Sequence, residues 1–195
     1  ESELAGHSFG DTTVPLAVTA THLETGTGRV LTQGNVVDAV LASSALPGFL
    51  PPVTVSGERL VDGAVADPMP LHVVTERGLS RVVVVDPGHA CGCPRVYEPA
   101  RSVIQQSVAV MTRHSIMSTD QTAGSDLEVV HIGLSCHDDL PFTDFTRASE
   151  MIESGYAEAN EALNRLPDGL PWSGQPRLYE SEPPRNEACA FTRSR

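Results

Sequence analysis

The sequence has 195 residues, of which 40% are hydrophobic, and this is enough for one domain with a sizeable core. Its 25 acidic residues exceed its 13 Lys and Arg, which gives a formal net charge of -12. This charge argues against nucleic acid as a partner, because such binding depends on basic side chains that neutralise phosphates, and it disfavours electrostatic adsorption to anionic lipid. Peripheral membrane contact would therefore have to use apolar residues.

The first predicted elements are two strands and a helix. Residues 14–21 are rich in Val, Thr and Leu and predict a mostly buried strand, and a turn leads to a second strand at 29–32. Asn35 is a favourable N-cap for a helix over residues 35–45. Four apolar residues of this helix have the spacing of one buried face: Val36, Ala39, Val40 and Leu41.

Proline and glycine at residues 46–48 end this helix. Residues 53–66 then predict two short strands around a Ser-Gly turn. Asp62 stands at the end of the second strand and is followed by Gly63 and Ala64. An acidic side chain is therefore expected at a strand end.

The following elements continue an α/β pattern. A helix over residues 67–78, with Asp67 as its cap, precedes a strand at 81–86, RVVVVD, whose β-branched residues predict burial on both faces. Because strand, helix and strand follow in this order, we expect this strand and the preceding one to form a parallel pair with a right-handed crossover. A long helix at 101–120 and a strand at 127–132 come next.

A helix over residues 146–166 is the last predicted element, and the tail at 167–195, rich in proline, glycine and charge, is predicted to be disordered. The residues expected on the inward face of this helix are Met151, Ile152, Tyr156, Ala159 and Leu163.

Two of these segments carry a resemblance to a known family. Residues 42–48, ASSALPG, and residues 60–70, LVDGAVADPMP, closely resemble the patatin-like phospholipases. The resemblance covers residues 9–165 in order and is greatest to the bacterial members related to the neuropathy-target-esterase branch. It implies an α/β, three-layer fold with a mostly parallel central sheet. It also implies that residues 1–166 are the C-terminal part of this domain and that the N-terminal part is missing.

The resemblance implies a lipid acyl hydrolase. In this family a serine in a Gly-x-Ser-x-Gly elbow attacks the ester carbonyl, and the aspartate of an Asp-Gly-Ala motif acts as the base without a histidine. The matching catalytic residue is Asp62, within the motif Asp62, Gly63 and Ala64. Burial raises the proton affinity of such a carboxylate, a hydrogen bond to the serine positions it, and the glycine lets the backbone turn beside it. The implied substrate is lipid or another ester, and no cofactor is implied.

The nucleophile is harder to find than the base. One string, GHSFG at residues 6–10, fits the elbow pattern, but an elbow needs a buried strand before the serine and a helix after it. ESELA precedes this string and DTTVP follows it, so Ser8 is not expected to be the nucleophile. Ser43 and Ser44, at a predicted helix end, are expected to be small packing residues. We therefore expect the serine and the oxyanion loop to lie upstream of Glu1, so that this chain alone would not hydrolyse esters.

The cysteines bear on location and on metal binding, and they lie in predicted loops or in the tail: Cys91, Cys93, Cys136 and Cys189. They do not form a dense disulfide framework, so a reducing, cytoplasmic location is expected. His89 and His137 lie beside them, but the Cys-x-Cys spacing is a weaker indication than the paired Cys-x-x-Cys of zinc sites, and no metal is predicted.

Two other interpretations stay open. The chain could be a catalytically inactive remnant that binds acyl ligands, or a metal-binding module built on Cys91, Cys93 and Cys136. Three further polar positions are expected to be structural: Asp86 as a loop cap, His131 as a sheet residue and His137 in a polar loop.

Overall fold

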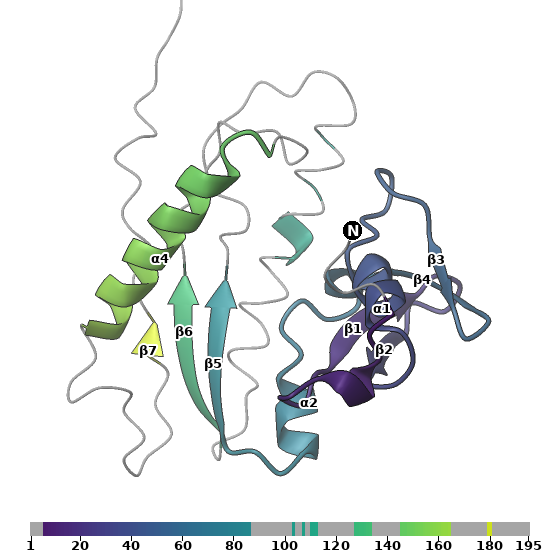
Figure 1. The fold of residues 1–195 in the computed structure, drawn as a ribbon, viewed down its shortest axis with the longest axis horizontal. Helices are drawn as coiled ribbons and strands as arrows, with labels where there is room; N and C mark the ends of the chain where they lie inside the picture. Colours follow the sequence, from purple (N-terminus) through teal and green to yellow (C-terminus); the bar gives the residue numbers. More distant parts are fainter. Residues whose placement is uncertain are drawn as a thin grey trace, which may run out of the picture. The chain divides into compact units, whose positions relative to one another are not determined.

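The computed structural model describes residues 6–86, 103, 107, 110–112, 127–133, 145–164 and 179–180. It divides into two compact units, of which the first extends to Val73 and the second begins at Val74 (Figure 1). Among the sequence predictions, those on the four cysteines and on His89 and His137 lie outside the described residues.

The first unit is built on a four-stranded antiparallel sheet in the order β2-β1-β4-β3. Its strands are β1 (Val18–His22), β2 (Gly28–Leu31), β3 (Val53–Val55) and β4 (Glu58–Asp62). Two residues, Ser56 and Gly57, join β3 to β4, and both have positive φ, 52° and 85°. This is the backbone that the tight hairpin turns with two positive φ values require, so the predicted Ser-Gly turn is confirmed.

Helix α1 (Val36–Ser43) covers one face of this sheet. The Asn35 side chain accepts hydrogen bonds from the backbone N–H groups of Val37 and Asp38, which confirms the predicted cap. Its buried residues are Val36, Ala39 and Ala42, and Ala42 packs with Ala20 of β1 and Leu60 of β4.

Two residues predicted to be buried in α1 are exposed. Val40 and Leu41 face away from the sheet, because the buried stripe is centred on Ala39. Small alanine side chains let the helix lie close to the strands, and this close approach decides which side of the helix faces the core.

The second unit contains a three-stranded parallel sheet in the order β5-β6-β7. Its strands are β5 (Arg81–Asp86), β6 (Glu128–Gly133) and β7 (Tyr179–Glu180). The division between the units falls within helix α2 (Leu71–Glu76), before β5, whereas helix α4 (Ala148–Asn164), after β6, belongs to the second unit. The described residues within the predicted helix at 101–120 are helical, and β7 falls inside the tail predicted to be disordered.

The α/β class is confirmed, but the prediction of a mostly parallel central sheet was wrong for the first unit. All four of its strands are antiparallel to their neighbours, and β4 and β5, predicted to be a parallel pair, belong to different sheets. Short connections explain this result, because β1 to β2 and β3 to β4 are joined by too few residues for a parallel crossover.

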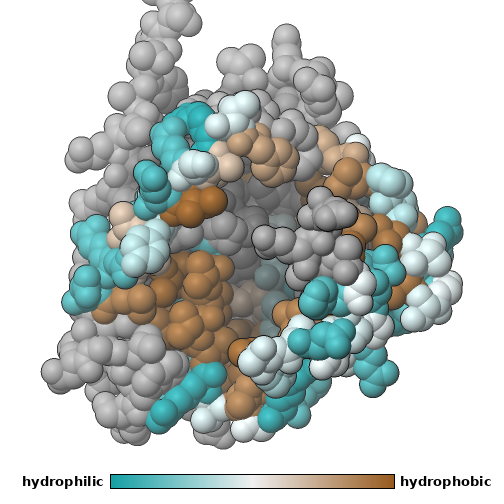
Figure 2. All heavy atoms as spheres, viewed as in Figure 1, coloured by the Kyte–Doolittle hydropathy of each residue, from teal (hydrophilic) through white to brown (hydrophobic). Residues whose placement is uncertain are grey.

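Burial in the second unit also differs from the prediction. Val83 and Val85 of β5 are exposed, although this strand was expected to be buried on both faces, and hydrophobic side chains gather over β5 and β6 in Figure 2. In α4 the predicted inward residues Met151, Ile152 and Tyr156 are exposed, and no residue of that helix is buried. A periodic apolar pattern shows that a face suits burial, whereas burial itself requires a neighbouring layer.

Candidate active site

Asp62 is the last residue of β4, and it caps the short 3-10 turn η2 (Gly63–Val65). Its side-chain Oδ1 accepts a hydrogen bond from the backbone N–H of Ala64 at 2.9 Å. Its own backbone N–H donates to the carbonyl of Ala45 at 3.1 Å. The structure therefore joins the two segments of the family resemblance, because Ala45 belongs to ASSALPG and Asp62 to the Asp-Gly-Ala motif.

The two oxygens of the Asp62 carboxylate have different surroundings. The side chain is half-buried, and no hydrogen bond to Oδ2 is found within the described part of the chain. Strand alternation places Asp62 on the same sheet face as Leu60, which packs against Ala42 of α1. The arrangement is a carboxylate with one oxygen fixed by the backbone and the other able to accept a proton.

Gly63 lies too close to β1 for any other residue. A Cβ atom at this position would stand 2.6 Å from the carbonyl oxygen of Thr19 and 2.7 Å from its Oγ1. The sequence predicted that glycine frees the turn from a side chain, and the structure shows that the space is occupied by Thr19.

Thr21 is a residue of this site that the sequence did not single out. It is 1% exposed, and its hydroxyl donates to the backbone carbonyl of Asp62 at 2.8 Å and lies 3.4 Å from that of Gly63. The same oxygen accepts the N–H of Ala66 at 3.1 Å. Threonine is common in strands, so the sequence gives no sign that Thr21 belongs to this site. Its role is visible only in the hydrogen bond to Asp62, 41 positions away.

Ser8 has different surroundings. Both its backbone N–H and its Oγ donate to Oδ2 of Asp11, each at 2.8 Å, and the three-residue 3-10 turn η1 (Phe9–Asp11) follows it. These two hydrogen bonds, the backbone one first, hold the pKa of Asp11 below its ordinary value, which makes this carboxylate a weaker base. A nucleophile elbow requires an α-helix after the serine, and η1 does not provide one.

The serines at the end of α1 make local contacts. The Ser44 hydroxyl donates to the carbonyl of Val40 at 2.8 Å, one helical turn earlier, and Ser43 is half-buried. Such a bond ties the side chain to its own helix, as expected for a residue that closes a helix end.

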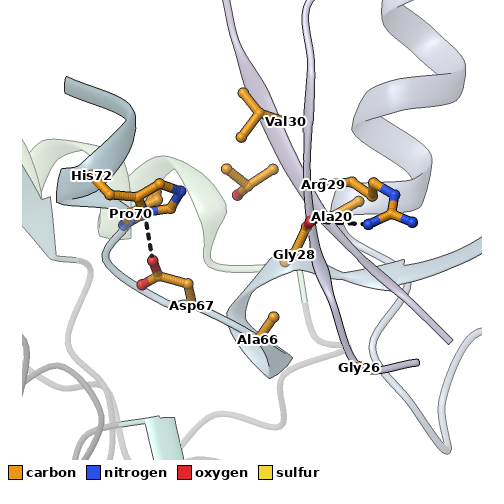
Figure 3. A pocket seen from close by; sticks show the side chains of 11 residues that line it. Ala20, Gly26, Gly28, Arg29, Val30, Ala66, Asp67, Pro70 and His72 are labelled. Carbon is orange, nitrogen blue, oxygen red and sulfur yellow. Dashed lines mark hydrogen bonds and ion pairs between the residues drawn. The ribbon is translucent and has the colours of Figure 1, made fainter. Parts of the chain in front are cut away.

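A pocket of about 270 Å³ adjoins the Asp-Gly-Ala turn (Figure 3). Thr19, Gly63 and Ala66 form part of its wall, together with Asp67 and His72, whose Oδ2 and Nδ1 atoms lie 3.1 Å apart. Asp62 is not among the lining residues, and its sheet face is opposite to that of Thr19. Gly63 thus connects the pocket to the motif without placing the Asp62 carboxylate inside it.

The described residues were compared with two further patterns, a cluster of metal-ligating side chains and a membrane-spanning helix. These residues hold no group of three or more His, Cys, Asp or Glu arranged around a common point. None of their helices combines the length and the apolar character that crossing a bilayer demands. In the second unit, Nε2 of His131 lies 3.7 Å from Oδ2 of Asp86 at the carboxyl end of β5.

Comparison with known proteins relates the first unit to a known family. Residues 5–75 match the model of the family described as patatin-like phospholipase, and this stretch contains the whole first sheet and both motifs. Over these residues the chain is similar to the patatin-like phospholipases.

Curated relatives of this chain include two proteins named lysophospholipase NTE1, from strains JEC21 and B-3501A of Cryptococcus neoformans var. neoformans serotype D. Each is 29% identical over 182 residues. The alignment covers 80% of this chain, which spans 11% of the length of each relative. The expected likeness to the neuropathy-target-esterase branch is thereby confirmed.

Proposed function

We propose that the protein hydrolyses carboxylic esters of lipids and that Asp62 is the general base for a serine nucleophile. The match of residues 5–75 to the patatin-like phospholipase model and the likeness to lysophospholipases support the reaction class. The observation that carries the assignment to Asp62 is its carboxylate, with Oδ1 held by the Ala64 N–H and Oδ2 without a partner in the described structure.

The proposed chemistry divides ester hydrolysis into two steps. As the serine oxygen attacks the ester carbonyl, its proton passes to Oδ2 of Asp62, and that proton then leaves with the alcohol while the acyl group stays on the serine. A water molecule, deprotonated by the same carboxylate, attacks the acyl-serine, and release of the fatty acid returns the proton to the serine. The fixed Oδ1 keeps Oδ2 directed to one position throughout.

We also propose that the nucleophilic serine lies outside these 195 residues. GHSFG is the one Gly-x-Ser-x-Gly string of the sequence, and its Ser8 donates to Asp11 in a short 3-10 turn. Ser44 donates to its own helix. These contacts favour structural roles, and they leave the base in this chain and the nucleophile in another part of the protein.

Labelling with a serine-reactive fluorophosphonate tests this division. The 195-residue chain and the protein at its full natural length would be treated in parallel, and the modified residue would be mapped by peptide mass spectrometry. We expect label on the full-length protein at a serine outside residues 1–195, and none on the shorter chain. Labelling at Ser8 would overturn the division and make the 195 residues a complete hydrolase.

Substitution of the base tests the reaction itself. In the full-length protein, Asp62→Asn should lower the turnover of a p-nitrophenyl ester by roughly 100- to 10,000-fold and leave the unfolding transition unchanged, because asparagine keeps the acceptor for Ala64 but cannot take up the proton. Asp38→Asn, an exposed aspartate on α1, is the matched control. Unchanged turnover in Asp62→Asn would exclude Asp62 as the base.

The second candidate is a catalytically inactive chain that binds acyl ligands. The engaged hydroxyl of Ser8 favours it over a self-sufficient enzyme. A full-length protein that is folded, unlabelled by the fluorophosphonate and still able to bind a fluorescent fatty acid would support this candidate against the hydrolase.

A further inference from the structure

We propose that Thr21 is a positioning residue of the hydrolase, and that its buried hydroxyl holds the Asp-Gly-Ala turn so that the Asp62 carboxylate stays directed at the nucleophile. This inference rests on the proposed function of Asp62. It concerns a residue of β1 that does not touch the reacting atoms and acts through the backbone of the turn.

The Thr21 hydroxyl joins the two ends of the segment from Asp62 to Ala66. It donates to the Asp62 carbonyl at 2.8 Å and accepts the Ala66 N–H at 3.1 Å. The side chain is 1% exposed, so water does not compete for these bonds. Thr21 also pairs with Val61, which ties β1 to the residue immediately before Asp62.

The position of Ala64 transmits this effect to the carboxylate. The Ala64 N–H donates to Oδ1 of Asp62 at 2.9 Å. Along the chain, Ala64 stands between the Asp62 carbonyl and the Ala66 N–H, the two groups that the Thr21 hydroxyl binds. Without the hydroxyl, the Asp62 carbonyl loses this partner, and Oδ1 follows any movement of the Ala64 N–H. A displacement of about 1 Å at a reacting group can reduce turnover about 100-fold.

The rest of the turn has enough support to survive this loss. The Ala66 N–H also lies 3.2 Å from the Gly63 carbonyl, which accepts the N–H of Asp67 at 3.1 Å as well. The Asp62 N–H keeps its bond to Ala45. Removal of the hydroxyl should therefore loosen the turn rather than unfold it, and this separates a positioning role from a purely structural one.

Kinetics of Thr21→Val in the full-length protein, with p-nitrophenyl butyrate as the probe, test the inference. Valine keeps the shape of threonine without the hydroxyl. We expect kcat to fall roughly 10- to 100-fold while KM changes less than about twofold, because the proton transfer is affected and substrate binding is not. Thr21→Ser, which restores the hydroxyl, should recover most of kcat. Thr54→Val, an exposed threonine on β3 of the same sheet, should leave kcat unchanged.

A double-mutant cycle with Asp62→Asn identifies the residue through which Thr21 acts. In the Asp62→Asn background, Thr21→Val should cause no further loss of the residual rate. An equal loss in both backgrounds, or a Thr21→Val protein with a lower melting temperature and wild-type kcat, would overturn the positioning role. If Thr21→Val does not fold, Thr21→Cys, which keeps a weak donor, should give an intermediate kcat, and a wild-type kcat there would count against the role.

The outcomes distinguish this inference from the proposed function. A wild-type protein without esterase activity, or an Asp62→Asn protein with unchanged kcat, overturns the function of Asp62 and the role of Thr21 with it. An inactive Asp62→Asn beside a fully active Thr21→Val overturns the role of Thr21 alone.

Discussion

The described part of the chain contains two 3-10 turns that begin at a capping polar residue, and they differ in what holds that residue in place. Ser8 precedes η1 and Asp62 precedes η2. At η1 the serine and the aspartate satisfy each other within four residues, at the surface. At η2 the carboxylate receives one local bond, while Thr21 of β1 and Ala45 after α1 hold the surrounding backbone.

This difference shows that a sequence match to a catalytic motif does not by itself reproduce the motif's structural setting. GHSFG has the letters of a nucleophile elbow, but its Ser8 donates to the exposed carboxylate of Asp11, the residue that follows the string. The Asp-Gly-Ala turn is held from two other elements, so its carboxylate need not use both oxygens to hold the turn. Support from distant residues is what keeps a reactive group available.

The largest expected difference between the two turns concerns turnover. Asp62→Asn should lower kcat of the full-length protein by roughly 100- to 10,000-fold, the usual contribution of a general base, whereas Asp11→Asn should leave kcat unchanged. Steady-state hydrolysis of p-nitrophenyl butyrate measures both. If kcat fell equally in Asp62→Asn and Asp11→Asn, Asp62 would have no catalytic role that Asp11 lacks.

The two turns also contain a matched pair of glycines. A Cβ at Gly63 would stand 2.6 Å from the Thr19 carbonyl, whereas a Cβ at Gly10 would approach only the Ser8 Oγ, at 3.6 Å. Gly63→Ala should therefore lower the free energy of unfolding by about 3 kcal/mol, and Gly10→Ala should change it little. Urea denaturation followed by circular dichroism distinguishes them, and a neutral Gly63→Ala would contradict the close contact with β1.

A smaller effect is expected at Ser8. Ser8→Ala removes one exposed hydrogen bond to Asp11 and should change the free energy of unfolding by about 0.5 kcal/mol or less, without loss of hydrolysis. Thermal unfolding and turnover of the same preparation provide the measurement. Loss of turnover with an unchanged melting temperature would give Ser8 the catalytic role that its surroundings argue against.

The smallest effect is a dependence of stability on acid at Asp11. Its pKa is lowered in the folded protein by the backbone and side-chain hydrogen bonds from Ser8, so the folded state favours the charged carboxylate. The resulting stability is present above the ordinary pKa of about 3.9 and is lost as the pH falls through the lower folded value. The difference in melting temperature between wild type and Asp11→Asn should thus be larger at pH 6 than at pH 3. An equal difference at pH 6 and at pH 3 would contradict the stabilisation of the charged Asp11 carboxylate by Ser8.

Much of the first unit could be predicted from the sequence, because its signals are local. The Asn35 cap, the Ser-Gly hairpin and the acid at the end of β4 each depend on a few neighbouring residues. Strand direction was predicted less well, because it depends on which strands meet, and β4 pairs with β1 rather than with β5. The prediction that Ile152 and Tyr156 are buried was wrong for a similar reason, because the periodic pattern of a helix does not show whether another layer covers it.

The sequence by itself determined the likeness to patatin-like phospholipases, the helix cap, the hairpin and the place of Asp62 in an Asp-Gly-Ala motif, since these follow from short runs of residues. Only the tertiary structure decided that Thr21 holds this turn, that Thr19 leaves no room beside Gly63, and that Ala45 binds the Asp62 backbone. Each of these contacts joins residues far apart in the chain, and hydrogen-bond distance and steric exclusion exist only once the strands have paired.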